Sequence, residues 1–324
     1  MEIKLFNPIV FFLSTMLFMT TVSFSQDKVV ALHTAGAEFN EAFEAIKQDL
    51  EGELILVSKE INPKQKWSNL REDILKEEPV ALVIMDNHAL NLYKEHVSNA
   101  LKNNVKPYPA VALMALQLPN ITQGMDIMGV SYEIPAVTSV VNLRAVSKKP
   151  IKKVGVLYRN SWESFFKQNQ GFCKTEQVDL IGVSIDDKSR NISRDINNGL
   201  RELINRKKVD ALWVVNDNAL LNNNTIAKNW IPATKRAKIP VIVGVETLVQ
   251  TKFELGSFAV LPDHSGLGSQ VANLLFELMD NDWSIDETQI DQPLSVVKII
   301  NTTLAKKKSF LNESGLSNMD KEIR

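Results

Sequence analysis

Six short apolar runs end in polar or small residues, and they fall into two sets along the chain. The first set lies at 29–34, 80–87 and 110–115, and the second at 154–160, 211–218 and 240–246. A near-continuous apolar run is typical of a strand buried on both faces in a parallel sheet. Ligands on such sheets bind beyond the carboxyl ends of the strands. Two sheets with polar rims facing each other indicate a ligand-binding cleft.

Segments with a helical spacing of apolar residues separate these strands. In the first of them, 37–50, the apolar positions are Phe39, Phe43, Ile46 and Leu50. The same spacing predicts helices at 67–75, 89–101, 136–147, 162–175, 192–205 and 225–237. Further strands are predicted at 54–57 and 180–184, and a short edge strand at 127–131. This alternation predicts an α/β protein with two doubly wound parallel-sheet lobes.

Length and composition fit a soluble protein of two domains. The chain has 324 residues, of which 44% are hydrophobic and 23% charged. Its net charge of −1 creates no broad field that would attract a nucleic acid or an anionic membrane. We therefore expect a small-molecule ligand and no nucleic-acid partner.

The amino terminus predicts export. An apolar run at 6–22 follows Lys4, and Ser23-Phe24-Ser25 places small residues before Gln26. This pattern predicts a signal peptide at 1–25 that is cleaved before Gln26, and hence a periplasmic protein. The alternative is an uncleaved helix that anchors the protein, because the run is almost long enough to span a membrane.

The sequence offers little for catalysis or for metal binding. Cys173 is the single cysteine and the four histidines are scattered, so we expect no disulfide, no metal site and no cofactor. No nucleophile elbow and no zinc-protease motif are present. We expect a protein that is not an enzyme, although a hydrolase or isomerase using Asp86, Asp217 and Glu246 remains a weaker alternative.

Several motifs together resemble the substrate-binding proteins of ABC transporters, in particular the tryptophan type with the type I periplasmic-binding-protein fold. They are Gly129-Val130-Ser131, Lys153 to Tyr158, Asp210-Ala211, Asp217-Asn218, Ile239-Pro240, and Asp263 with Leu267-Gly268. The resemblance implies two lobes joined by three crossovers. Lobe one would comprise 26–131 and 259–292, and lobe two 132–258 and 293–310. A polar tail at 311–324 would follow, and the hinges would lie near Ser131, Phe258 and Pro293.

The lobe-one pocket departs from the family pattern. After the first strand the family usually has a hydroxyl residue followed by His-Pro, where this chain has His33-Thr34-Ala35-Gly36. After the third strand Asp86-Asn87-His88 replaces the usual Thr-Pro. The ligand of the family therefore does not transfer to this chain.

Candidate ligand contacts in lobe one follow the first and third strands. The loop Thr34, Ala35, Gly36 opens a predicted helix whose free N–H groups can hold a ligand carboxylate. Asp86, Asn87 and His88 stand at the matching place after the third strand, where His88 can titrate near neutral pH. Helix capping with an exposed histidine explains this second group equally well.

Candidate contacts in lobe two also lie at strand ends. Asp217 can accept hydrogen bonds from a ligand ammonium, and Asn218 can donate and accept; the alternative is a helix cap. Tyr158 and Asn160 flank the first loop of the lobe, where an aromatic ring can stack on a ligand. Two further acids, Glu246 and Asp263, end strands near the cleft.

These observations predict a periplasmic solute-binding protein of an ABC-type uptake system. Its lobes would close over a small polar or amphipathic ligand, which we expect to be amino-acid-like. It would work as a monomer with an ABC permease or a membrane sensor. The alternative is a secreted two-lobe signalling module that binds a partner protein and has lost transport.

Overall fold

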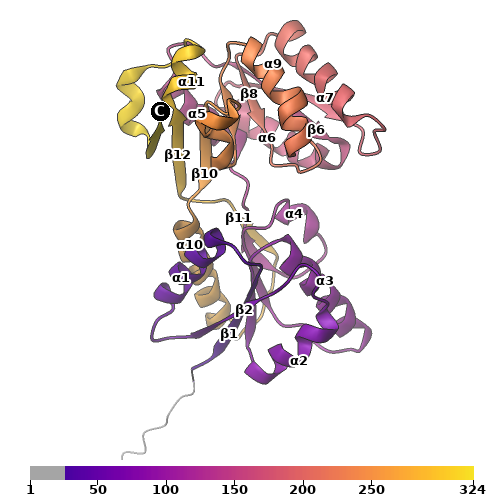
Figure 1. The fold of residues 1–324 in the computed structure, drawn as a ribbon. Helices are drawn as coiled ribbons and strands as arrows, with labels where there is room; N and C mark the ends of the chain where they lie inside the picture. The colour runs from indigo at the N-terminus through magenta and orange to yellow at the C-terminus, as the bar shows by residue number, and fades with distance from the viewer. Residues whose placement is uncertain (1–25) are drawn as a thin grey trace, which may run out of the picture.

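The structure is a computed structural model that describes residues 26–324. The predicted signal peptide at 1–25 lies outside the described residues. The chain forms two α/β lobes, which Figure 1 shows one above the other. The prediction of two parallel-sheet α/β lobes is confirmed.

Lobe one is built on a six-stranded sheet in the order β11-β5-β4-β3-β1-β2, with every pair parallel. The strands are β1 (Lys28–His33), β2 (Ile55–Glu60), β3 (Ala81–Ile84), β4 (Ala110–Ala112), β5 (Met128–Val130) and β11 (Gln289–Asp291). The short strand predicted at 127–131 is confirmed as β5, but its predicted edge position is wrong, because β11 returns from a distant part of the chain and pairs with β5.

Helices cover both faces of this sheet. Along β1, Val29 and Ala31 pack with one group of helices, and Val30 and Leu32 pack with the other. The first group is α1 (Ala37–Asp49) and α10 (His264–Asp280), and the second is α2 (Trp67–Glu77) and α3 (Asn87–Lys102). A short helix, α4 (Leu118–Ile121), follows β4. Burial on both faces explains why the central strands β1, β3 and β4 are mostly apolar.

Lobe two contains a seven-stranded sheet in the order β13-β12-β10-β9-β8-β6-β7. Its strands are β6 (Lys153–Arg159), β7 (Asp179–Ile185), β8 (Ala211–Val214), β9 (Val241–Val243), β10 (Phe258–Pro262), β12 (Val296–Asn301) and β13 (Lys321–Ile323). All neighbours are parallel except β10 and β12, which run antiparallel. The late strands β12 and β13 thus extend a sheet that the middle of the chain began.

The helices of lobe two also form two layers. One face is covered by α5 (Ala136–Ala145), α6 (Glu163–Thr175) and α11 (Thr302–Lys307). The other is covered by α7 (Ile192–Arg201) with the π-turn η2 (Glu202–Arg206), and by α8 (Asn223–Thr225), η3 (Ile226–Trp230) and α9 (Ile231–Arg236). Short 3-10 turns are η1 (Asn160–Trp162), η4 (Glu246–Val249), η5 (Thr251–Phe253) and η6 (Glu313–Asn318).

The chain passes between the lobes at three places. These are the segment 131–135 before α5, the junction of β10 with α10, and the segment 292–295 before β12. The predicted boundary at Phe258 is wrong, because Ala259 to Pro262 continue β10 and pair with β12 in lobe two. The second crossover therefore falls at Asp263, which precedes α10.

The carboxyl-terminal segment is part of lobe two, so the prediction of a polar tail at 311–324 is wrong. Strand β13 pairs with β12, and the Ile323 side chain is buried. The Thr302 hydroxyl donates to the Ile323 carbonyl at 3.1 Å, and the Thr251 hydroxyl donates to the Arg324 carbonyl at 3.0 Å. Ile323 is the buried residue of this strand, whereas Lys321 and Glu322 are exposed, as is usual at the edge of a sheet.

Deleting residues 320–324 should destabilise lobe two. The deletion removes a strand from the sheet and exposes the apolar surface around Ile323, at a cost of about 2 kcal/mol. Chemical denaturation of the shortened and full chains measures this cost. Unchanged stability would mean that β13 contributes nothing to the sheet it joins.

Candidate ligand-binding site between the lobes

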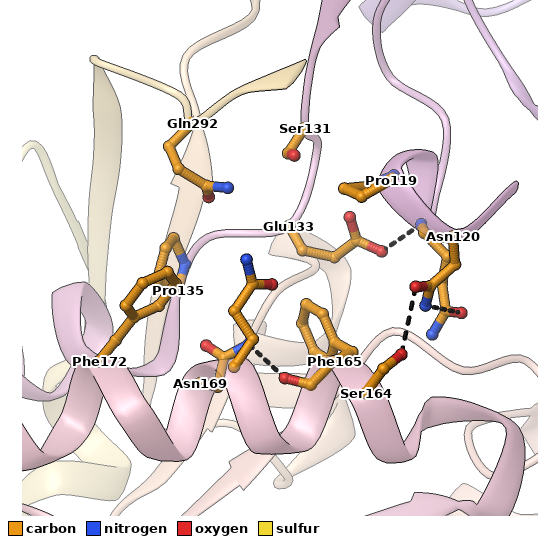
Figure 2. Close-up of a pocket in the computed structure, with 12 residues that line it drawn as sticks. Pro119, Asn120, Ser131, Glu133, Pro135, Ser164, Phe165, Asn169, Phe172 and Gln292 are labelled. Atoms are coloured by element: carbon orange, nitrogen blue, oxygen red, sulfur yellow. Dashed lines mark hydrogen bonds between the residues drawn. The ribbon is translucent and has the colours of Figure 1, made fainter. Parts of the chain in front are cut away.

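A cavity of about 290 Å³ lies between the lobes at the first crossover. Lobe one contributes α4 and the turn before it, lobe two contributes one side of α6, and the crossovers close the back (Figure 2). The lining residues are Gln117, Pro119, Asn120, Ser131, Glu133, Pro135, Ser164, Phe165, Gln168, Asn169, Phe172 and Gln292. This volume is at the lower end of the range for small-molecule sites.

The two lobes touch directly at one edge of the cavity. The Ser164 hydroxyl at the start of α6 donates to Asn120 Oδ1 of α4 at 3.2 Å, as Figure 2 shows. Asn169 holds the other end of the site together: its Oδ1 accepts from the Ala136 N–H at 2.8 Å, and its Nδ2 donates to the Phe165 carbonyl at 3.0 Å. The wall that α6 presents to the cavity is therefore fixed to the first crossover.

Glu133 is a buried carboxyl group in the crossover and faces this cavity. It is 9% exposed, and its Oε1 accepts a hydrogen bond of 2.6 Å from the Gln117 N–H. Gln117 has a left-handed backbone, with φ of 58°, and is the N-cap residue of α4. Burial raises the pKa of Glu133 to about 7, and the hydrogen bonds from backbone N–H groups oppose the rise.

Three buried polar atoms near this cavity lack a hydrogen-bond partner within the described residues. They are Gln117 Nε2, Ser131 Oγ and Asn216 Oδ1. Gln117 and Ser131 line the cavity itself. A buried polar group without a partner costs about 1–3 kcal/mol, so such groups need an explanation. A ligand that supplies the missing hydrogen bonds is one such explanation.

Asn216 belongs to a smaller hollow that lies behind the cavity. This hollow is at the carboxyl ends of β8, β9 and β10, and Glu133 and Phe165 line it as well as the cavity. The Asn216 Nδ2 donates to the Gly244 carbonyl at 3.2 Å, which leaves its Oδ1 free. A pocket beyond the carboxyl ends of parallel strands is the expected place for a ligand.

Aromatic rings form the apolar side of the cavity. Phe165 stacks on Trp213 with ring centroids 5.8 Å apart, and it meets Trp162 edge-on at 5.4 Å. Phe172 lies nearer the carboxyl end of α6 and is 36% exposed. Phe165 is thus held rigidly by the core, whereas Phe172 lies nearer the solvent.

The predicted lobe-one residues form a bonded network outside this cavity. The Thr34 N–H and hydroxyl donate to Asp86 Oδ2 at 2.7 and 2.8 Å, and the Ala89 N–H donates to Asp86 Oδ1 at 2.7 Å. Asn87 exchanges two hydrogen bonds of 2.9 Å with the backbone of Leu116. His88 Nε2 lies 2.9 Å from the Asn62 carbonyl. Asp86 therefore caps α3 and ties it to β1, which was the alternative reading of the sequence.

The loop before α1 provides no side-chain cap. Ala35 and Gly36 precede α1, and Gly36 is its N-cap residue with an extended backbone. The Asn40 N–H already donates to the Gly36 carbonyl at 3.3 Å.

The predicted lobe-two residues also bond mainly to the protein. Asp217 is 2% exposed: its Oδ2 accepts from Arg159 Nε at 2.6 Å and its Oδ1 from the Ala219 N–H at 2.9 Å. The Tyr158 hydroxyl donates to Glu163 at 2.6 Å. Asn160 and Asn218 are exposed, so their side chains are open to solvent.

The last two predicted residues lie at the edges of the cleft. Glu246 pairs with Lys321 of β13. Asp263 accepts from the Ser295 hydroxyl at 2.9 Å, and this bond joins the second crossover to the third. The twelve residues predicted from the sequence are absent from the lining of the cavity and of the hollow behind it.

Sequence reasoning missed the three polar residues that define the cavity, Gln117, Ser131 and Glu133. Gln117 follows the predicted strand at 110–115, Ser131 ends the one at 127–131, and Glu133 lies in the crossover after them, but none was chosen as a ligand contact. One signal was present: Glu133 is an acid inside the short segment Tyr132-Glu133-Ile134-Pro135, whose neighbours are apolar or aromatic. A carboxyl group in such surroundings is unusual unless it is paired or used.

The structure also bears on metal binding and membrane spanning. Across residues 26–324, no three His, Cys, Asp or Glu side chains gather in a way that suits a metal ion. No helix in the same range combines the length and apolar character that a membrane span requires.

Comparison with known proteins identifies the fold. No family model matches the sequence, and no curated protein matches it. Solved structures match over most of the chain. A Streptococcus pneumonia ABC domain in complex with L-Trp covers 92% of this chain and 100% of its own, with 16% identity and a TM-score of 0.58.

Two further structures match in the same way. A ligand-free, open substrate-binding protein with adhesive properties from Clostridium difficile covers 93% of this chain and 100% of its own, with 12% identity and a TM-score of 0.65. A chain of the XylFII–LytSN complex covers 86% of this chain and 99% of its own, with 13% identity and a TM-score of 0.55. This chain has the type I periplasmic-binding-protein fold, and it resembles the substrate-binding proteins of ABC transporters at low sequence identity.

Proposed function

We propose that this protein is a solute-binding protein whose lobes close over one small polar or amphipathic ligand. The observation that carries the proposal is the interlobe cavity, in which a buried carboxyl group and two buried polar atoms without partners face the same space. Each buried polar group without a partner costs about 1–3 kcal/mol, and a ligand held between the two lobes would remove that cost.

We further propose that the protein is exported and delivers its ligand to an ABC permease. The resemblance to ABC substrate-binding proteins and the apolar segment at the amino terminus support this proposal. The resemblance favours an amino-acid-like ligand only as far as a small molecule that carries an ammonium group, because the residues lining the cavity offer no cation to a carboxylate. We attribute no reaction to the cavity, because a buried carboxyl group beside amides and a hydroxyl suits recognition.

A membrane sensor is the second candidate partner. The changed residues of the lobe-one loops, such as Asp86 and Asn87, motivate it, and one matched structure is a complex of two differently named proteins, XylFII and LytSN. In that case the ligand-bound protein would activate the sensor instead of delivering its ligand to a permease.

The strand-end residues predicted from the sequence remain candidates for the surfaces that meet when the lobes close. Their contacts divide them. Asn160 and Asn218 expose their side chains in this structure, whereas both oxygens of Asp86 and of Asp217 are already bonded. We therefore expect Asn160 and Asn218 to reach a ligand more readily than the two aspartates.

A ligand of this site should close the lobes. A thermal-shift screen with amino acids, amines, small organic acids and sugars identifies a binder, and small-angle scattering then compares the free and bound protein. We expect the radius of gyration to fall on binding, because the crossovers act as a hinge.

Two serine variants control this experiment. Ser131→Ala should lower the affinity for the compound that the screen identifies. Ser314 is an exposed serine of η6, and Ser314→Ala should leave this affinity unchanged. A tight binder that changes neither the scattering nor its affinity for Ser131→Ala would contradict the proposed function.

A further inference from the structure

The chemistry of the cavity goes further than the general function and rests on it. We propose that the cavity selects a small organic cation, namely an amine whose ammonium group pairs with Glu133 and whose apolar part lies against Phe165 and Phe172.

The charges of the lining residues favour a cation. Glu133 is the ionisable residue among those lining the cavity, and the others are amides, hydroxyls, prolines and phenylalanines. A ligand carboxylate would therefore find no lysine or arginine side chain there, and it would lie beside a second carboxyl group. An ammonium group instead gives the buried Glu133 carboxylate the partner it lacks.

The surroundings of Glu133 supply no competing charge. On its own segment Tyr132 is neutral, because burial raises the pKa of its hydroxyl to about 12, and that hydroxyl lies 3.2 Å from His264 Nε2 at the start of α10. On α6, Glu163 and Lys167 pair with each other at 3.3 Å. The Glu133 pKa is raised first by burial, and the groups that lower it are backbone N–H donors. A bound cation is thus the group that would ionise Glu133.

The unpartnered atoms specify the rest of the ligand. Ser131 Oγ can accept a second ammonium hydrogen bond, because an ammonium group has three donors. Gln117 Nε2 is a donor and requires an acceptor on the ligand, such as a hydroxyl or carbonyl oxygen. Phenylalanine rings attract a cation over their faces and an apolar group by contact. The class is therefore an amine that also carries an uncharged oxygen and an apolar group.

Four matched probes test this class by calorimetry at about pH 8.5. They are phenylalaninol, the diol in which a hydroxyl replaces its amine, phenylalanine and phenyllactate. We expect phenylalaninol to bind at least about tenfold more tightly than the other three, because a hydrogen bond between charged groups contributes that much.

A proton count links the binding to Glu133. At about pH 6 Glu133 is mostly protonated, so binding of phenylalaninol should release up to one proton, seen as heats that depend on the buffer. At about pH 8.5 the release should vanish. Glu133→Gln should lose at least about tenfold in affinity and release no proton, while Glu176→Gln, an exposed acid after the far end of α6, should behave like the wild type.

Each other outcome has a definite meaning. Equal or tighter binding of the diol, phenylalanine or phenyllactate overturns the cation class but leaves solute binding intact. Phenylalaninol binding that survives Glu133→Gln removes Glu133 from the site. If none of the four probes binds, this inference is wrong, and the broad screen with scattering then decides separately on solute binding.

Discussion

Glu133→Gln should make the ligand-free protein more stable at about pH 8 and leave it nearly unchanged at about pH 4.5. The pKa of Glu133 is about 7 in the folded protein, against 4.5 for an ordinary glutamate. Between these values the folded state binds a proton that the unfolded state has lost, so the stability of the wild type falls as the pH rises through this window. Above about pH 7 the loss is complete and constant.

The size of this effect follows from the raised pKa. A pKa of about 7 in place of 4.5 corresponds to about 3 kcal/mol of lost stability at high pH. The glutamine amide keeps the shape of the side chain and its oxygen can still accept from the Gln117 N–H. The raised pKa already includes the effect of that hydrogen bond, so the variant should gain about 3 kcal/mol at about pH 8.

Chemical denaturation at several pH values measures the difference between Glu133→Gln and the wild type. Taking the difference cancels the titrations of all other groups. The same series on Glu176→Gln, whose side chain is exposed, should give a flat difference. A flat difference for Glu133→Gln as well would show that Glu133 is ordinary in the folded state.

Asp217→Ala should destabilise lobe two by about 2–3 kcal/mol while leaving the affinity for phenylalaninol unchanged. The substitution removes the acceptor of the Arg159 Nε bond and of the Ala219 N–H bond. Breaking a buried ion pair costs about 3–5 kcal/mol. The cost is smaller here because Arg159 is 26% exposed and keeps a bond of 3.1 Å to Asp187.

Asp187→Ala is the matched control for this prediction. Asp187 bonds to the same arginine and also accepts from the Ser161 N–H and hydroxyl at 2.9 and 2.6 Å, but it is exposed, so its loss should cost about 1 kcal/mol. Denaturation and calorimetry on both variants separate structure from binding. An Asp217→Ala protein that keeps its stability and loses tenfold in affinity would place Asp217 in contact with the ligand, as the sequence predicted.

Local patterns determined the elements and the two lobes of this protein. Each buried strand is apolar along its whole length because helices cover both faces of both sheets, and the sequence alone carries that information. The helices α1, α2, α3, α5 and α6 follow from apolar residues at helical spacing. The resemblance to binding proteins rested on several such motifs in order, and the fold confirms it.

Tertiary structure decided which segments leave one lobe and enter the other. Strand β10 lies in lobe two because it pairs with β9 and β12, and β13 lies at the sheet edge because it pairs with β12. Pairing partners distant in sequence leave no mark in a local pattern of apolar residues. The boundary at Phe258 and the polar tail were wrong for this reason.

Tertiary structure also decided which polar residues face the cavity. Asp86 and Asp217 stand at strand ends, where the sequence predicts ligand contacts, but their oxygens are taken by backbone and arginine donors of the same lobe. Glu133, Ser131 and Gln117 come together because a crossover and a left-handed turn from different parts of the chain meet there. The sequence shows which side chains are polar, and the packing of the chain determines which of them remain without a partner.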